Sequence, residues 1–168
     1  WMWNVVISQT AIYHNDKLTA ELLINILAAR KPELLATVAE SLAFRGDTPA
    51  DLKAFLTKEG DTPALRAAIF AGLLRRELPI QRARAAALPL KGLYAGVDIV
   101  QKPEQSADLP AALAAISAGP DRDGADRQYA RYLAALGHLD QARRLLPAAE
   151  QSTLAASYAS YLVAVGDF

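Results

Sequence analysis

The stretch 130–146, ARYLAALGHLDQARRLL, has the most regular pattern of apolar positions in the chain. Apolar residues recur every three or four positions up to Leu136, Gly137 interrupts them, and Ala142 and Leu146 resume the pattern. A glycine at the end of a helix adopts positive φ without a Cβ clash, so the chain can reverse within a few residues. The pattern predicts two antiparallel helices joined at Gly137, with the small Ala142 where they cross.

Similar turns recur along the chain. Each follows an apolar stretch, and the clear turns are separated by about thirty residues or by about three times that distance. The longest gap therefore predicts two less obvious turns inside it. The clear turn residues are Asn15, Gly46, Gly137 and Gly166, and the less obvious turns fall at Leu78-Pro79 and Ala107-Asp108.

Side-chain size follows the same register. A small residue stands seven positions before most turns, and a large one stands just before it, as interdigitating stacked helices require. We therefore expect Tyr129 and Tyr158 in the core. The small set is Ser8, Ala39, Ala71, Val100, Ala130 and Ala159, the large set is Ile7, Val38, Phe70, Ile99, Tyr129 and Tyr158, and the apolar set nine positions after the turns is Ile24, Phe55, Ala87, Ile116 and Leu146.

We expect no β-sheet, because no segment sustains a two-residue alternation of apolar and polar positions. The turns and the helical periodicity instead predict one all-α domain over residues 1–168, in which about five and a half helix-turn-helix repeats stack into a right-handed superhelix. Thr48-Pro49 and Thr62-Pro63 combine a threonine cap with a proline at the first helical position. The expected helices are 2–14, 17–30, 33–45, 49–58, 62–76, 79–87, 90–101, 108–118, 124–136, 139–146 and 151–165.

The composition supports a packed helical core and excludes several function classes. Hydrophobic residues make up 52% of the chain, and 18 basic residues balance 18 acidic ones, so no overall field attracts nucleic acid or an anionic membrane. The chain has no cysteine, which excludes a disulfide framework, a thiolate nucleophile and a cysteine-based zinc site.

Membrane and targeting signals are missing from this sequence. No apolar run reaches the roughly 18 residues that a membrane-spanning helix needs, so we expect no transmembrane segment. The opening residues are apolar but lack the basic start and the cleavage site of a signal peptide. Because the chain begins at Trp1 rather than at methionine, we expect it to be part of a longer protein.

The repeated features resemble the tetratricopeptide repeat family. The resemblance is carried by the small residue in each first helix, the turn glycine, the alanine five positions later (Gly137 and Ala142), and the proline that opens a repeat at Pro32. It implies a superhelix whose first helices line a concave face. The units are shorter than the family's usual length, Asp51 replaces the alanine of the second unit, and glycines and a proline interrupt the unit at 90–119. An irregular helical repeat of a related kind is the alternative.

No cluster of residues has the spacing of an established catalytic, metal or cofactor site. His14 and His138 lie in turns beside aspartates and lack a second ligand at helical spacing. The acidic stretch 119–124 lacks the glycine and glutamate positions of an EF-hand, and we interpret it as a solvated connection. Phosphate-loop, dinucleotide-binding, GxSxG and HExxH motifs are absent. We therefore expect no cofactor, no metal site and no catalytic residue.

The first helices place one set of residues on the predicted concave face. Four of them are arginines of the later repeats, and arginine makes bidentate hydrogen bonds to carboxylates, so the face favours an acidic protein or peptide partner. Alternatively, these arginines only solvate alanine-rich helices. The set comprises Gln9, Tyr13, Glu40, Phe44, Arg75, Arg76, Gln101, Arg127 and Arg131.

The leading hypothesis for function is a non-catalytic scaffold that mediates protein–protein interaction. The resemblance implies this role. Similar arrays occur in Gram-negative envelope assemblies for exopolysaccharide synthesis and export, so we favour the periplasm over the cytoplasm. The alternative is an all-α glycosidase or lyase acting on polysaccharide, which needs two convergent carboxylates, or a tyrosine with a basic partner, in one cleft.

Both ends of the chain are expected to be adhesive. Repeat arrays normally end in a polar capping helix, but the first helix here begins with Trp1 and Trp3, and the last one carries Tyr158, Leu162 and Val165. We therefore expect the array to continue on at least the C-terminal side in a longer protein, and the chain by itself to self-associate end to end.

Overall fold

The computed structural model describes residues 34–46, 49–87 and 106–166, and every regular element in these ranges is a helix. The all-α prediction is confirmed for this part of the chain. None of its helices is long and apolar enough to cross a membrane. The helices expected at 2–14, 17–30 and 90–101, and the turn at Asn15, lie outside the described residues.

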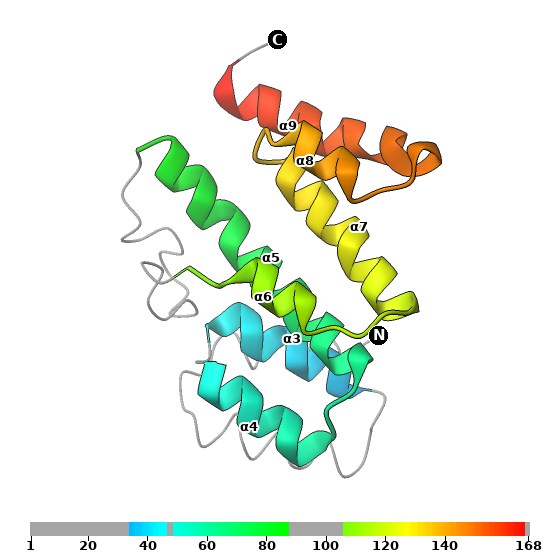
Figure 1. The fold of residues 1–168 in the computed structure, drawn as a ribbon. Coiled ribbons are helices and arrows are strands. Elements are labelled where there is room, and N and C mark those ends of the chain that lie inside the picture. The colour runs from blue at the N-terminus through cyan, green and yellow to red at the C-terminus, as the bar shows by residue number, and fades with distance from the viewer. Residues whose placement is uncertain (1–33, 47–48, 88–105, 167–168) are drawn as a thin grey trace.

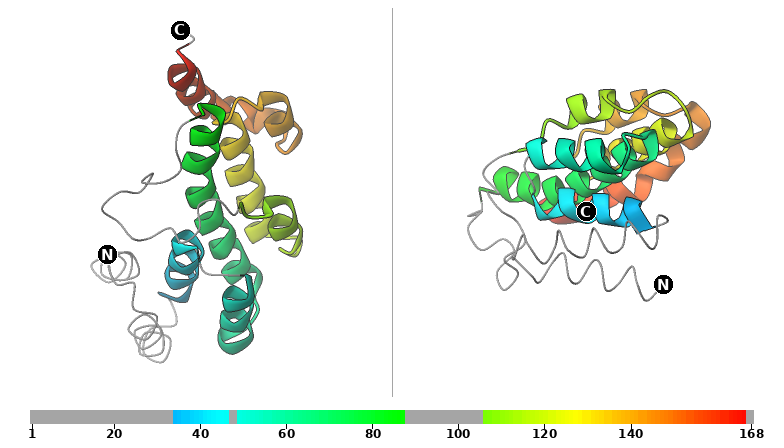
Figure 2. Two further views of the ribbon diagram at one scale, coloured as in Figure 1. Left: turned by 90° about the vertical axis from the view of Figure 1, so that its left-hand side faces the viewer. Right: turned by 90° about the horizontal axis from the view of Figure 1, so that it is seen from below.

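The helices form a chain of neighbours that runs from one end of the molecule to the other (Figure 1). The central helix α5 packs against α3 and α4 belongs with α3 at one end, whereas α7 packs on α5 and carries α8, η2 and α9 at the other end. Figure 2 shows α5 and α7 running side by side. The elements are α3 (Leu35–Arg45), α4 (Pro49–Glu59), α5 (Pro63–Ala85), α6 (Leu109–Ala114), α7 (Pro120–Ala134), α8 (Leu139–Arg144), the 3-10 helix η2 (Ala148–Leu154) and α9 (Ala155–Val165).

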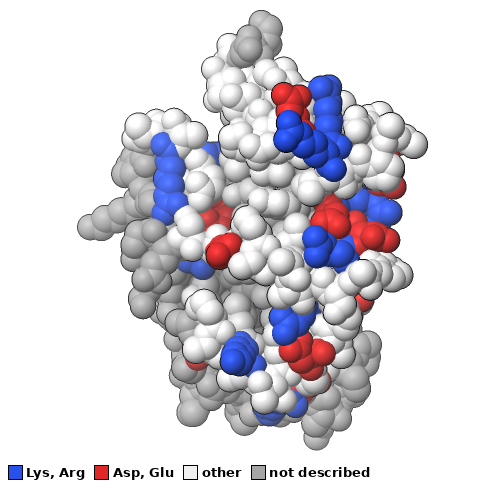
Figure 3. Space-filling view, in the orientation of Figure 1, with Lys and Arg blue, Asp and Glu red and all other residues white. Residues whose placement is uncertain are grey.

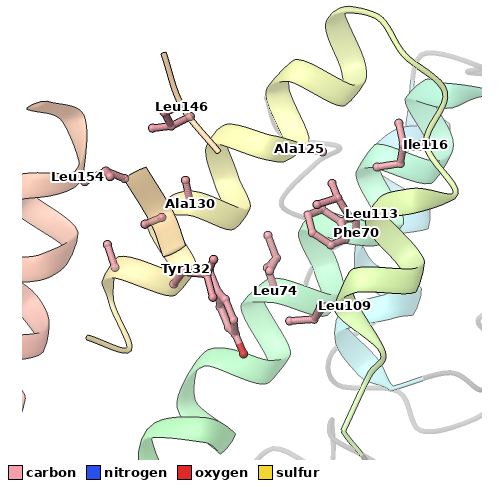
Figure 4. Packing of buried hydrophobic residues seen from close by; sticks show 13 residues of the cluster. Phe70, Leu74, Leu109, Leu113, Ile116, Ala125, Ala130, Tyr132, Leu146 and Leu154 are labelled. Atoms are coloured by element: carbon pink, nitrogen blue, oxygen red, sulfur yellow. The ribbon is translucent and has the colours of Figure 1, made fainter. Parts of the chain in front are cut away.

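Buried apolar side chains form two cores, and α5 contributes to both. Phe70 and Leu74 of α5 belong to a central core with α6, α7, α8 and η2 (Figure 4). Leu65 and Ile69 belong to a second core, with α3 and α4. Leu73 packs against both. The central core comprises Phe70, Leu74, Leu109, Leu113, Ile116, Ala125, Ala130, Tyr132, Leu133, Ala134, Ala142, Leu146 and Leu154, and the second core comprises Leu34, Val38, Ala39, Leu42, Ala43, Leu52, Phe55, Leu56, Leu65 and Ile69.

The turn between α7 and α8 forms as its sequence predicts. Gly137 has a φ of 86°, its N–H donates to the Ala134 carbonyl at 3.0 Å, and the His138 N–H donates to the Leu133 carbonyl at 2.9 Å. This pair of hydrogen bonds is the Schellman arrangement that ends helices at glycine. A Cβ at Gly137 would lie 2.5 Å from the Tyr161 ring, so α9 also packs directly on the turn. Gly46 and Gly166 likewise have positive φ, of 91° and 73°, at the ends of α3 and α9.

The backbones of α3 and α5 come close together at Gly72, where the two helices cross. A Cβ at this position would lie 2.2 Å from the backbone oxygen of Glu40 and 2.9 Å from the Cβ of Ala43. Only a residue without a side chain allows the two backbones to come this close. The sequence pattern gave no sign of this crossing.

The turn predicted at Leu78-Pro79 is wrong, because α5 continues through Pro79 to Ala85. The helix begins as expected, with the Thr62 side chain accepting a hydrogen bond from the Leu65 N–H at 3.3 Å. A proline inside a helix removes one backbone hydrogen bond, yet Ile80, just after it, is completely buried and holds the following turn in place. Ala87 was expected to pack against neighbouring helices because it stands nine positions after that predicted turn. Since the turn does not form, Ala87 is instead exposed, with a φ of 53°.

Arg82 anchors the part of α5 that follows the proline. Its Nε and Nη2 atoms donate to the Ala135 carbonyl at the end of α7, at 3.3 and 3.2 Å. Nη2 also donates to the Ser160 Oγ of α9 at 2.9 Å. One side chain therefore joins three helices and stabilises the continuation of α5 that the sequence did not predict.

The start of α7 also differs from the expectation. Gly119, with a φ of 145°, precedes Pro120 at the first helical position, so the predicted solvated connection is the first turn of a helix. Asp121 and Asp123 in that turn lie near the positive end of the helix dipole, which favours acidic side chains. The right-handed superhelix stays a prediction. The expected first helices α3, α5, α7 and α9 do pack in series, but α5 and α7 are in direct contact although the unit expected at 90–119 separates them in sequence.

Ala142 is completely buried, as its register predicts. We expect Ala142→Leu to overpack the α7–α8 crossing and lower the free energy of unfolding by about 1–3 kcal/mol. Urea denaturation monitored by circular dichroism measures the change. Ala54→Leu, at an exposed position of α4, is the matched control and should leave the midpoint nearly unchanged. Equal midpoints for the two variants would contradict the assigned crossing.

Gly72→Ala should lower the free energy of unfolding by about 1–3 kcal/mol, because the new Cβ must push α3 away from α5. Gly124→Ala provides the matched control. A Cβ at Gly124 of α7 meets nothing within 4 Å, so the better helix propensity of alanine should stabilise the protein by up to about 1 kcal/mol. The same denaturation assay should therefore give shifts of opposite sign, and two stabilising shifts would show that α3 is not held against α5 at this point.

Candidate functional site

The predicted concave-face residues are only partly brought together. Gln9, Tyr13 and Gln101 lie outside the described residues. Glu40, Phe44 and Arg75 do meet on the surface where α3 crosses α5. An Nη1 atom of Arg75 lies 2.7 Å from Oε1 of Glu40, and the guanidinium carbon lies 4.8 Å from the centre of the Phe44 ring.

The remaining arginines of that set have different surroundings. Arg76 is only 6% exposed and lines the cleft that is described below. Nε of Arg127 donates a hydrogen bond to Oε2 of Glu150 in η2 at 2.7 Å, and this bond raises the pKa of Arg127. Arg131 is exposed on α7. Figure 3 shows Lys and Arg interspersed with Asp and Glu on this face of the molecule rather than gathered in a patch of one sign.

The described residues form a cleft of about 650 Å³ between α4 and the start of α6, with α5 as its floor. This volume is in the range of small-molecule and side-chain pockets. The cleft opens where the two cores diverge, because Leu73, which touches both cores, lies in its floor. Its lining residues are Gly46, Pro49, Leu52, Lys53, Leu56, Thr57, Asp61, Arg66, Ile69, Leu73, Arg76, Ser106, Ala107, Asp108, Ala112 and Ala115.

Helical periodicity explains the composition of the two longer walls. From α4, Leu52 and Leu56 line the cleft one turn apart, with Lys53 beside them. From α5, Ile69 and Leu73 lie one turn apart on the same side of the helix. The interior is therefore mainly aliphatic, and the polar groups are placed at its ends and rim.

The cleft is lined by three basic side chains, Lys53, Arg66 and Arg76, and by the acidic Asp61 and Asp108. Nε and Nη2 of Arg66 each lie 2.6 Å from an oxygen of Asp61, and this hydrogen bonding lowers the pKa of the Asp61 carboxyl. Asp108 accepts a hydrogen bond from the Ala111 N–H at 3.0 Å and so caps α6. Lys53 is exposed, and no hydrogen bond or ion pair of its ammonium group is found within the described part of the chain.

A completely buried glutamate positions the α6 wall. Oε1 of Glu77 accepts a hydrogen bond from the Ala107 N–H at 2.9 Å, and Oε2 accepts one from Nε2 of Gln81 at 3.2 Å. Gln81 also donates to the Ser106 hydroxyl at 3.1 Å, and Arg84 donates to the same oxygen. A buried carboxylate is costly unless it is hydrogen-bonded, so these contacts specify where the chain must enter α6.

Two tyrosines of α7, Tyr129 and Tyr132, pack in or against the central core that also contains residues of α6. The rings of Tyr129 and Tyr132 are stacked, with centroids 5.9 Å apart, and Tyr132 extends from α7 toward α5 (Figure 4). Burial raises the pKa of the Tyr132 phenol, and the nearby Glu77 carboxylate adds to the shift. Burial also raises the pKa of Tyr129, with a smaller effect from Asp108. With raised pKa values, both phenols keep their protons at neutral pH and cannot act as bases.

The sequence indicated some of these residues and missed others. Phe55 and Phe70 were expected in the core and are buried. Glu77 was not singled out, although it stands in the apolar register of Phe70, Leu74 and Ile80. A charged residue in such a register is the signal that would have identified it, because it implies a buried hydrogen-bonding partner.

The acidic side chains of the cleft are engaged in contacts within the protein. Within the three described ranges, no three His, Asp or Glu side chains are grouped to hold a metal ion. Asp61 and Asp108 both line the cleft, but one is in an ion pair and the other caps a helix. No protein-family model, curated protein or solved structure matches this chain.

The tyrosine environment predicts a loss of stability in alkali. The pKa of Tyr132 is raised in the folded state, so its contribution is fully present below the unfolded pKa of about 10 and is lost as the pH rises above it. We expect the difference in unfolding free energy between the native chain and Tyr132→Phe to be constant from pH 7 to 9 and to shrink above pH 10. Denaturation series at several pH values test this, and parallel profiles throughout would contradict the burial of the phenol.

Proposed function

We propose that the chain is a non-catalytic helical scaffold that binds a partner protein through the cleft between α4, α5 and α6. The observation that carries the proposal is the cleft itself: an aliphatic interior on three helices, with an exposed lysine on its wall. Such a site accepts large apolar side chains from a peptide segment of the partner. Kinship with tetratricopeptide repeats is part of the proposal, and the glycine turns and the serial packing of α3, α5, α7 and α9 support it.

The polar groups of the cleft support binding rather than polysaccharide cleavage. A glycosidase needs one carboxyl group with a raised pKa to act as the acid and a second carboxylate across the scissile bond. The pKa of Asp61 is lowered instead of raised, and Asp108 is engaged at the start of α6. A lyase needs a tyrosine that gives up its proton readily, and burial raises the pKa values of Tyr129 and Tyr132.

The aliphatic side chains of the cleft and the lysine beside them indicate which chemical groups the partner would present. Leu52, Leu56, Ile69 and Leu73 offer contacts to leucine, phenylalanine or similar side chains. The ammonium group of Lys53 lies beside them and favours a carboxylate next to the apolar anchor. We therefore propose a partner segment that combines large apolar residues with acidic ones, in agreement with the acidic partner expected from the sequence.

Selection from a phage-displayed library of random peptides tests this function. The enriched peptides should combine large apolar with acidic residues. Their affinity should fall about tenfold or more, which is roughly 1.4 kcal/mol, for Ala115→Trp, because the indole fills the end of the cleft. Ala114→Trp is the matched control, since Ala114 is the neighbouring exposed residue and does not line the cleft.

A charge reversal at Lys53 tests whether the partner is acidic, separately from whether the cleft is the binding site. Lys53→Glu should weaken the binding of the acidic peptides severalfold, whereas Lys58→Glu, five residues further along α4 and outside the cleft, should leave their binding nearly unaffected. Peptides that bind Ala115→Trp as tightly as the native chain would show that the cleft is not the binding site. Equal affinities for the two charge variants would exclude the acidic partner.

A further inference from the structure

The floor of the cleft is a straight stripe along α5. Arg66, Ile69, Leu73 and Arg76 line it at intervals of three and four residues, which places them on one side of the helix. Arg66 and Arg76 are ten residues apart, so the stripe is about 15 Å long at a rise of 1.5 Å per residue. The cleft is therefore elongated along a helix axis.

The two walls beside this floor differ in the size of their side chains. From α4, Leu52 and Leu56 face the cleft, whereas α6 contributes Ala112 and Ala115. The leucines of α6 belong to the central core instead. Small side chains along one wall let the backbone of another helix come close. In Figure 1, α4 and α6 run in the same general direction, so a helix lying between them contacts both along its length.

We propose that the partner segment binds in this cleft as an amphipathic α-helix. This inference rests on the proposed function and adds the conformation of the bound segment. The apolar residues of the segment recur at positions i, i+3, i+4 and i+7 and contact Leu52, Leu56 and Leu73. Acidic residues beside this stripe face the ammonium group of Lys53 on the α4 wall.

The backbone of the bound segment favours the same conformation. Every regular element of the described ranges is a helix, and the N–H and C=O groups inside a helix bond to one another. The described walls of the cleft therefore offer no sheet edge with which an extended segment can pair. A helix satisfies its own backbone groups and presents only side chains to the aliphatic interior, so its desolvation costs less.

Two synthetic peptides of identical composition distinguish a helical from an extended segment. Each contains leucine, glutamate and alanine in about fifteen positions; the leucines stand at i, i+3, i+4 and i+7 in one peptide and at alternate positions in the other. Fluorescence anisotropy should show that the 168-residue chain binds the first peptide at least tenfold more tightly. This binding should weaken about tenfold or more for Ala115→Trp and stay nearly unchanged for Ala114→Trp, whose indole lies outside the cleft.

Changes to the backbone of the first peptide give a second readout. A staple between two outward-facing positions i and i+4 should strengthen binding, because less entropy is lost when the helix forms. A proline in the middle of the peptide should weaken binding at least tenfold, because it interrupts a helix but not an extended chain.

The possible results separate this inference from the function on which it rests. Binding of the alternating peptide that equals or exceeds that of the first and is lost in Ala115→Trp would overturn the helical conformation and leave the cleft as the binding site. Tolerance of the central proline would overturn it in the same way. If neither peptide binds and no peptide selected from the random library responds to Ala115→Trp, the proposed function fails, and this inference fails with it.

Discussion

The continuity of α5 through Pro79 is the constraint on which the rest of the structure depends. One side of this helix supplies Leu65 and Ile69 to the core with α3 and α4, and the other supplies Phe70 and Leu74 to the core with α6 and α7. The proline removes one hydrogen bond of the helix, but the burial of Ile80 and the contacts of Arg82 offset that loss. Because both cores share one rigid helix, the sector between them remains partly open, and the cleft lies there.

The second half of the molecule repeats one local pattern, because α7 and α9 are each followed by a glycine with positive φ. The glycine after α7 is Gly137, and Tyr161 of α9 packs directly on it. The missing side chain of Gly137 therefore makes room for an aromatic ring of the following helix, whereas a Cβ at Gly166, after α9, would meet nothing within 4 Å.

The sequence predicted the features that depend on local chemistry. The turns at Gly46, Gly137 and Gly166 and the cap at Thr62 were predictable, because positive φ and side-chain capping are properties of a few neighbouring residues. Burial at Ala142 followed from the register. Three other features depend on helices that are distant in sequence, so no local pattern predicts them. They are the continuation of α5 through Pro79, the crossing at Gly72 and the burial of Arg76. The cleft belongs to the second group, because its walls come from α4, α5 and α6, which the sequence pattern assigned to separate repeats.

The hydrogen bond from Arg82 to Ser160 connects residues 78 positions apart. Closing so long a loop costs conformational entropy, and that cost must be met before the contact contributes any stability. The helices between these two residues pack mostly on near neighbours in sequence and can form earlier. We therefore expect the hydrogen bonds of Arg82 to form late in folding and to affect the rate of unfolding more than the rate of folding.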